Sequence, residues 1–170
     1  MVDHLLRAAN FNAYSKVLPG ELPDQQIVRV PQSDIKRLRE IISEPGIWVI
    51  SMRSAANVLR GESVVYAFPE VYPNRLVALS GDILASVRFT PTERNNATIR
   101  TRLNLLLTSA YAEAKRRGSL AASLRFDGGA LAYLGQTLMD QPEREVTLQA
   151  ISARDSNSAD PIFVVVKSIL

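Results

Sequence analysis

One long helix is the strongest local prediction of this sequence, between about residues 91 and 117. It opens on Thr90-Pro91-Thr92-Glu93, which supplies a capping hydroxyl, a proline at the first helical position and a glutamate three residues after the cap. It closes at Gly118, a residue that readily takes the left-handed conformation found at helix ends. Any fold of this chain must therefore bury one side of a long helix with defined ends.

The two sides of this helix differ in chemistry when its residues are placed at 100° intervals. One side is apolar, so we expect it to face the core. The opposite side carries Arg94, Arg102 and Arg116 together with Ser109, and Leu105 falls among them. The residues of the expected core side are Ile99, Leu103, Leu106, Leu107, Ala110 and Ala114.

Short β-branched or alternating apolar segments lie on both sides of the helix and predict strands. Residues 47–50 are all apolar, so we expect a central strand that is buried on both faces. We expect the two segments around Gly81-Asp82 to pair through a turn there, and the last two strands to form a hairpin. The predicted strands are residues 26–30, 47–50, 63–68, 75–80, 83–89, 120–126, 145–152 and 162–169.

Two shorter helices are also predicted. One follows Ser33, a candidate N-cap, and ends at Glu44-Pro45-Gly46, and the other contains Leu131 and Leu138. The order of elements favours an α+β fold, in which helices pack on a mixed or antiparallel sheet. The alternation is too irregular for a doubly wound α/β fold, which is the alternative.

The first 24 residues differ from the rest of the chain. Their apolar spacing predicts a short amphipathic helix, and Pro19 and Pro23 then favour an extended segment. We therefore predict an arm over residues 1–24 and a single α+β domain over residues 25–170. The arm either folds back on its own domain or docks onto a neighbour, through Leu5, Leu6, Leu18 and Leu22.

Cysteine and histidine are nearly absent from the 170 residues, with no Cys and one His. This excludes a thiolate nucleophile, a disulfide framework, cysteine zinc sites and sites that need several histidines. His4 is interpreted as an ordinary polar residue near a terminus. We accordingly expect no cofactor, no metal site and no enzymatic activity.

The sequence shows no apolar run long enough to span a membrane and no signal peptide at its start. We therefore expect no membrane partner, no secretion by a signal peptide, and a location in the cytoplasm or within an assembled particle.

Positive charge is concentrated around the long helix. Residues 91–127 contain seven basic and three acidic residues, whereas the remainder contains 13 basic and 14 acidic residues. One interpretation is an Arg-bearing face for phosphate or a protein partner, formed by Arg94, Arg102, Arg116 and Arg117. The other is that these arginines pair with acidic residues elsewhere in the fold.

Two further segments have weaker chemical patterns. Asp127-Gly128-Gly129 precedes a helix and is interpreted as a turn, with a phosphate cradle as the alternative. Asp140, Glu143 and Glu145 form an acidic cluster, which acts in acid–base chemistry only inside a cleft.

We predict a non-enzymatic assembly subunit that associates with copies of itself. Small cysteine-free subunits of virus or phage particles are one class that fits this description. A nucleic-acid-binding module that uses the Arg-bearing helix face is the first alternative, and an enzyme without a recognisable motif is the second.

Overall fold

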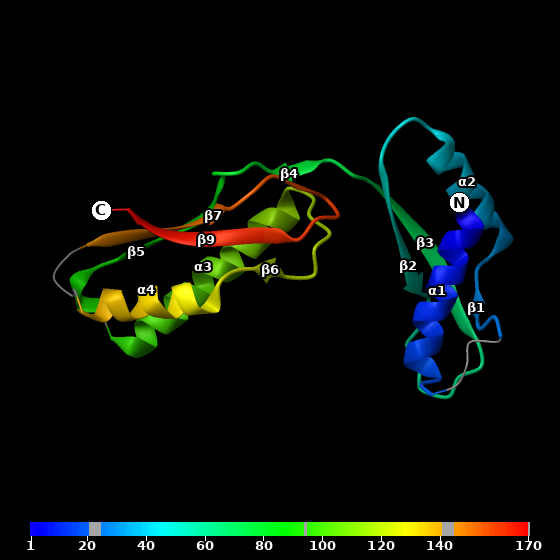
Figure 1. Ribbon diagram of the computed structural model, residues 1–170, viewed down its shortest axis with the longest axis horizontal. Coiled ribbons are helices and arrows are strands. Elements are labelled where there is room, and N and C mark those ends of the chain that lie inside the picture. Colours follow the sequence, from blue (N-terminus) through cyan, green and yellow to red (C-terminus); the bar gives the residue numbers. More distant parts are fainter. Residues whose placement is uncertain (21–24, 94, 141–144, 170) are drawn as a thin grey trace. The chain divides into compact units, whose positions relative to one another are not determined.

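The computed structural model describes the chain except residues 21–24, 94, 141–144 and 170 (Figure 1). It divides into two compact units, Met1–Asn74 (unit 1) and Arg75–Leu170 (unit 2). The sequence placed a boundary at residue 24, whereas the structure places it between Asn74 and Arg75. The difference arises because the first helix packs into the core of unit 1 instead of leaving it.

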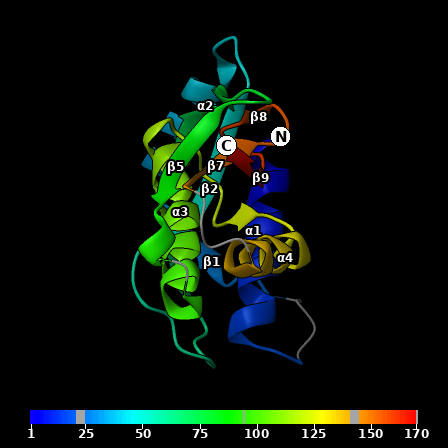
Figure 2. The ribbon, with the colours of Figure 1, turned by 90° about the vertical axis from the view of Figure 1, so that its left-hand side faces the viewer.

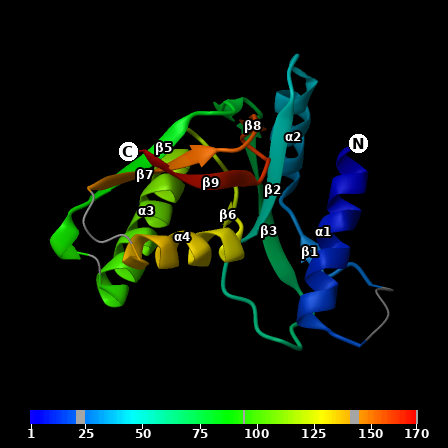
Figure 3. The same ribbon diagram turned by 60° about the vertical axis from the view of Figure 1, so that its left-hand side comes forward.

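Unit 1 is built on a three-stranded sheet with the order β1-β3-β2, in which β1 is parallel and β2 antiparallel to β3. Its elements are α1 (Val2–Val17), β1 (Val28–Arg29), α2 (Gln32–Ser43), β2 (Trp48–Ser54) and β3 (Val65–Pro73). The first helix runs beside β1 and β3 (Figure 3). The core contains Tyr14 and Val17 of α1 against Ile27, Val28, Val65 and Ala67.

Two local predictions for unit 1 are wrong. β2 lies at an edge of the sheet and is only half-buried, because the longer β3 occupies the centre and pairs on both sides. Ile47, predicted to be buried, is 73% exposed. Ser33 is not the cap of α2, which begins at Gln32 directly after Pro31. Pro31 is itself the N-cap, with φ −56° and ψ 140°, and no side chain caps the helix.

Unit 2 is built on a four-stranded sheet with the order β5-β7-β9-β6, plus a separate two-stranded pair, β4 with β8. β5, β7 and β9 are antiparallel neighbours, and β6 is parallel to β9. The elements are β4 (Leu76–Ala78), β5 (Ile83–Phe89), the 3-10 turn η1 (Pro91–Glu93), α3 (Asn96–Arg116), β6 (Leu124–Arg125), α4 (Gly128–Asp140), β7 (Val146–Ser152), β8 (Ser156–Asn157) and β9 (Ile162–Ile169). The α+β prediction is confirmed.

The helices α3 and α4 lie on the same side of the β5-β7-β9 sheet (Figures 1 and 3), and Figure 2 shows them beside each other. Their apolar side chains form one core with Phe89, Leu148 and Ile162 of the strands. All six residues predicted as the core side of the long helix are buried in α3, so this prediction is confirmed.

The predicted start of the long helix is wrong by several residues. The Thr90 N–H does donate to the Glu93 carboxylate at 3.1 Å, but this contact spans the 3-10 turn η1, which the Glu93 N–H closes by donating to the Thr90 carbonyl oxygen. The α-helix begins after Asn95, whose side-chain oxygen accepts from the Thr98 N–H at 2.8 Å. At the other end Gly118 has φ +103°, as the sequence predicted.

The turn around Gly81 is confirmed, with φ +92° at that glycine. However, the strands that flank it do not pair with each other, because β4 pairs with β8 and β5 pairs with β7. The predicted hairpin of the last two long strands is confirmed by the antiparallel register of β7 and β9, from Thr147 opposite Ile169 to Ser152 opposite Val164.

Candidate functional site

Arg102 lies on the side of α3 opposite the core stripe, where the sequence placed it, but its guanidinium is engaged within unit 2. It forms an ion pair with Glu93 and donates to the backbone oxygen of Arg88 at 2.8 Å. The guanidinium carbon also lies 5.7 Å from the centre of the Phe89 ring. Arg102 therefore connects α3 to the end of β5 and to the 3-10 turn η1 that follows it.

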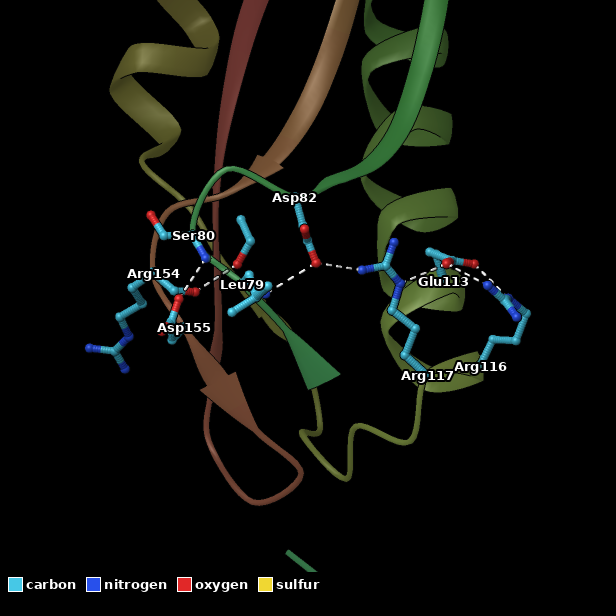
Figure 4. A network of polar contacts seen from close by, with 9 residues as sticks. Leu79, Ser80, Asp82, Glu113, Arg116, Arg117, Arg154 and Asp155 are labelled. Carbon is cyan, nitrogen blue, oxygen red and sulfur yellow. Dashed lines mark hydrogen bonds and ion pairs between the residues drawn. The ribbon is translucent and has the colours of Figure 1, made fainter. Parts of the chain in front are cut away.

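Arg116 and Arg117, at the end of α3, share the carboxylate of Glu113 (Figure 4). Both guanidiniums donate to it at 2.7 Å, and Arg117 also donates to Asp82 at 2.8 Å. The hydrogen bonds from Arg116 and Arg117 lower the pKa of Glu113 from 4.5 to about 2. Asp82 lies in the turn before β5, so this network joins the end of α3 to that turn.

The predicted phosphate-binding face consists largely of arginines that already have acidic partners. Arg102, Arg116 and Arg117 each form an ion pair inside the unit, as the second interpretation of the sequence expected. Arg94, the fourth predicted residue, lies outside the described residues. A phosphate at this face would have to compete with carboxylates that are already in place.

The predicted contact residues of the N-terminal arm belong to unit 1. Leu5, Leu6 and Leu18 are half-buried, whereas Leu22 lies outside the described residues. The arm thus takes the first of its two predicted courses and folds back on its own unit. Asn10 of α1 holds it there: its side-chain oxygen accepts from the N–H groups of Ile27 and Val28 at 2.9 and 3.0 Å.

The opposite face of the unit 2 sheet is left open, because both α-helices of this unit cover the other face. Ile83, Ile151 and Val165 are aligned across β5, β7 and β9, and we call them the apolar row. Ile83 and Val165 are 49% and 41% exposed. The sequence pattern did not predict this row, because the alignment of its three residues depends on the register of three strands and on a bulge between Ile83 and Ala85.

Polar residues continue this open face beyond the apolar row. Ser86, Gln149 and Lys167 lie opposite one another in the next row. Further along, Arg88 forms an ion pair with Glu145, and its hydrogen bonds lower the pKa of that carboxyl. The open face therefore carries the apolar row at one end and, at the other, an internally neutralised pair in line with Ile169, which is 47% exposed.

Residues 78–168 match the family model of the DUF3084-associated C-terminal helical hairpin. The match covers more than half of the 170 residues. This chain belongs to that family.

The matched region of the hairpin family lies within unit 2 and contains both α3 and α4. The two helices approach each other at Gly135 of α4, where a β-carbon would lie 3.7 Å from Leu103 and 3.8 Å from Ile99. The open sheet face and the ion-pair network of α3 also fall inside the matched region.

One curated protein is similar in sequence to most of this chain. An uncharacterized protein of Nostoc sp. (strain PCC 7120) is 27% identical over 166 residues, which cover 96% of this chain and 33% of that protein. The chain thus spans about a third of the length of the curated relative that it matches. No solved structure matches the chain.

The weaker chemical patterns of this hairpin-family chain have structural partners. Asp127 caps α4, accepting from the N–H groups of Gly129 and Ala130 at 2.8 and 3.1 Å, so its own carboxylate occupies the proposed phosphate cradle. In the acidic cluster, Asp140 accepts from Gln136 and Glu145 pairs with Arg88, while Glu143 lies outside the described residues.

Two kinds of site are absent from the described part of the chain. No group of three or more His, Asp or Glu residues there is arranged to hold a metal ion. None of its helices is long and apolar enough to cross a membrane.

Proposed function

We propose that this chain is a non-enzymatic assembly module that associates with a second copy of itself through the open face of the unit 2 sheet. The observation that carries the proposal is the apolar row of Ile83, Ile151 and Val165, which none of the described helices of unit 2 covers. Burying such a row removes apolar surface from water, which is the main driving force of association.

A second copy is a suitable occupant because a two-fold interface brings the same patch of each subunit together. A row that crosses three strands can pack on its own symmetry mate as two sheets pack in a sandwich. Arg88 and Glu145 are already paired within the unit, so they need no charged partner on the second copy. Lys167 can extend its ammonium toward the rim along its apolar stem.

Sedimentation equilibrium of the full chain over a range of concentrations tests this proposal. We expect wild-type protein to associate reversibly and Val165→Glu to weaken association at least tenfold, because the glutamate would be buried without a partner. Tyr133→Glu is the matched control, since Tyr133 is 76% exposed but lies on α4. A wild-type monomer at all concentrations, or an equal effect of both variants, would contradict the proposal.

Nucleic-acid binding is the second candidate, and charge distribution favours it. Unit 2 contains twelve basic and nine acidic residues, whereas unit 1 contains eight of each. Arg100 and Arg125 of unit 2 are exposed and form no ion pair with any described residue. These two arginines therefore replace the predicted Arg stripe as the contacts to test.

Titration with single-stranded and duplex oligonucleotides at two salt concentrations tests this second candidate. Phosphate contacts are strongest at low salt, so binding at about 50 mM salt should fall steeply as salt is raised. The double substitution Arg100→Glu and Arg125→Glu should abolish binding. Absence of binding at the lower salt would remove the candidate.

Membership of a virus or phage particle stays a prediction, and any role of a longer protein that contains this region is outside the proposal. Neither is needed for the self-association proposed here. Sedimentation therefore tests the module itself, whatever larger chain or particle it belongs to.

A further inference from the structure

A groove of about 660 Å³ lies within unit 1, between α1 and the loop of residues 55–62. Ile50 and Met52 of β2 and Ala67 of β3 also line it, giving it an apolar floor. The volume falls in the range of about 300–1,000 Å³ that is typical of small-molecule sites. All residues that line this groove lie outside the region matched by the hairpin family and outside the apolar row.

One stripe of α1 forms a side of the groove. Leu5, Ala9, Asn12 and Lys16 all line it, and their spacing of three or four residues places them on one side of the helix. The stripe extends for about 16 Å, given a rise of 1.5 Å per residue. Ala9, in the middle of the stripe, has a short side chain that projects little into the groove. An elongated apolar ligand can therefore lie along this side of α1.

The groove has positive charge at one end. The Gly61 N–H donates to the Val17 carbonyl oxygen at 2.9 Å, which ties the loop to the end of α1. Lys16, which precedes Val17, and Arg60, which precedes Gly61, both line the groove. Among the described residues no carboxylate lines it, and neither cation forms an ion pair with any of them.

We propose that this groove binds a single-chain amphiphile with an anionic carboxylate head. The alkyl chain lies on the floor of Ile50 and Met52, and the head lies between Lys16 and Arg60. The apolar floor accounts for the chain, and Lys16 and Arg60, which form no ion pair with a described residue, account for the sign of the head. Self-association through unit 2 is not required for this binding.

Isothermal titration calorimetry of the full chain with dodecanoate, kept below its micelle concentration, tests the proposal. We expect saturable binding at one site. Acetate, which has the head without the chain, should not bind detectably. Dodecyltrimethylammonium, which has the chain with a cationic head, should bind at least tenfold more weakly than dodecanoate.

Two variants locate the site. The double substitution Lys16→Glu and Arg60→Glu should weaken dodecanoate binding at least tenfold, whereas Lys36→Glu with Arg29→Glu, exposed cations outside the groove, should leave it unchanged. Ala9→Phe should block binding by filling the groove, with circular dichroism as the check on folding. Equal binding of the cationic amphiphile, unchanged binding by the charge-reversed variant, or binding of an acidic amphipathic peptide in place of dodecanoate would overturn the proposal.

Discussion

At the scale of single residues, carboxylates decide what the arginines of α3 do. The carboxylates of Glu93, Glu113 and Asp82 form ion pairs with arginines that the sequence analysis assigned to phosphate binding. Arg117 and Asp82 are 35 positions apart, so no helical spacing could reveal their contact. The charge excess was correctly located by sequence, but its use depended on which acidic residues the fold brought beside it.

The Glu113 network should stabilise the protein in a pH-dependent manner. The pKa of Glu113 is lowered from 4.5 to about 2, so its contribution is present above pH 4.5 and is lost as the pH falls toward 2. Glu113→Gln should therefore be less stable than wild type at pH 6, and this difference should shrink between pH 4.5 and 2. Urea unfolding followed by circular dichroism at several pH values measures it.

Glu40→Gln serves as the control for that series, because Glu40 is an exposed carboxylate that forms no ion pair with a described residue. A difference between Glu113→Gln and wild type that stays constant down to pH 2 would show that the ion pairs contribute nothing.

Asn10 should be needed to hold α1 on unit 1. Asn10→Ala leaves the buried N–H groups of Ile27 and Val28 without their acceptor, at a cost of about 1–3 kcal/mol in unfolding free energy. Asn10→Asp keeps an accepting oxygen and should recover most of the loss. Fluorescence of Trp48, which lies in unit 1, reports the unfolding. Equal stability of Asn10→Ala and wild type would exclude the proposed role.

At the scale of elements, the periodicity of α3 determined which residues it buries, but not where it begins. The six residues of its core stripe follow from helical spacing alone, since any packed helix must bury its apolar side. The sequence pattern predicts a start at Thr90, whereas the α-helix is capped by Asn95, five residues later. The contact of Thr90 with Glu93 belongs to the 3-10 turn, and the contact of Asn95 with Thr98 begins the helix.

Two leucines on α3 provide a matched test of that stripe. Leu106 is 1% exposed and Leu105 is 58% exposed. Leu106→Ala should lower the unfolding free energy by about 2–5 kcal/mol, because it leaves a cavity in the core of unit 2. Leu105→Ala should change it by less than about 0.5 kcal/mol. Urea unfolding compares them, and similar losses in both variants would mean that the core stripe is assigned wrongly.

At the scale of the whole molecule, the division into two units separates the chemistry of the chain. Unit 1 is electrically balanced and contains the apolar groove, while unit 2 carries the net charge of +3 and the open sheet face. Each unit has its own apolar cluster. The two proposed binding surfaces therefore lie on cores that do not share buried residues.

We expect the units to respond separately to a core substitution. Leu106→Ala should shift the unfolding transition of unit 2 to lower urea, while the transition reported by Trp48 fluorescence stays where it is in wild type. Circular dichroism and fluorescence on the same samples measure both transitions. Coincident shifts in the two signals would mean that the chain unfolds as one cooperative unit.

The sequence by itself determined the α+β class, the hairpin of the last two long strands and the buried stripe of α3. These features follow from local periodicity and turn chemistry, which act over a few residues. The tertiary structure alone decided the boundary between the units, the edge position of β2, the pairing of the arginines and the apolar row. Each of these depends on which distant strands and side chains meet, and that choice is made by packing of the whole core rather than by neighbours along the chain.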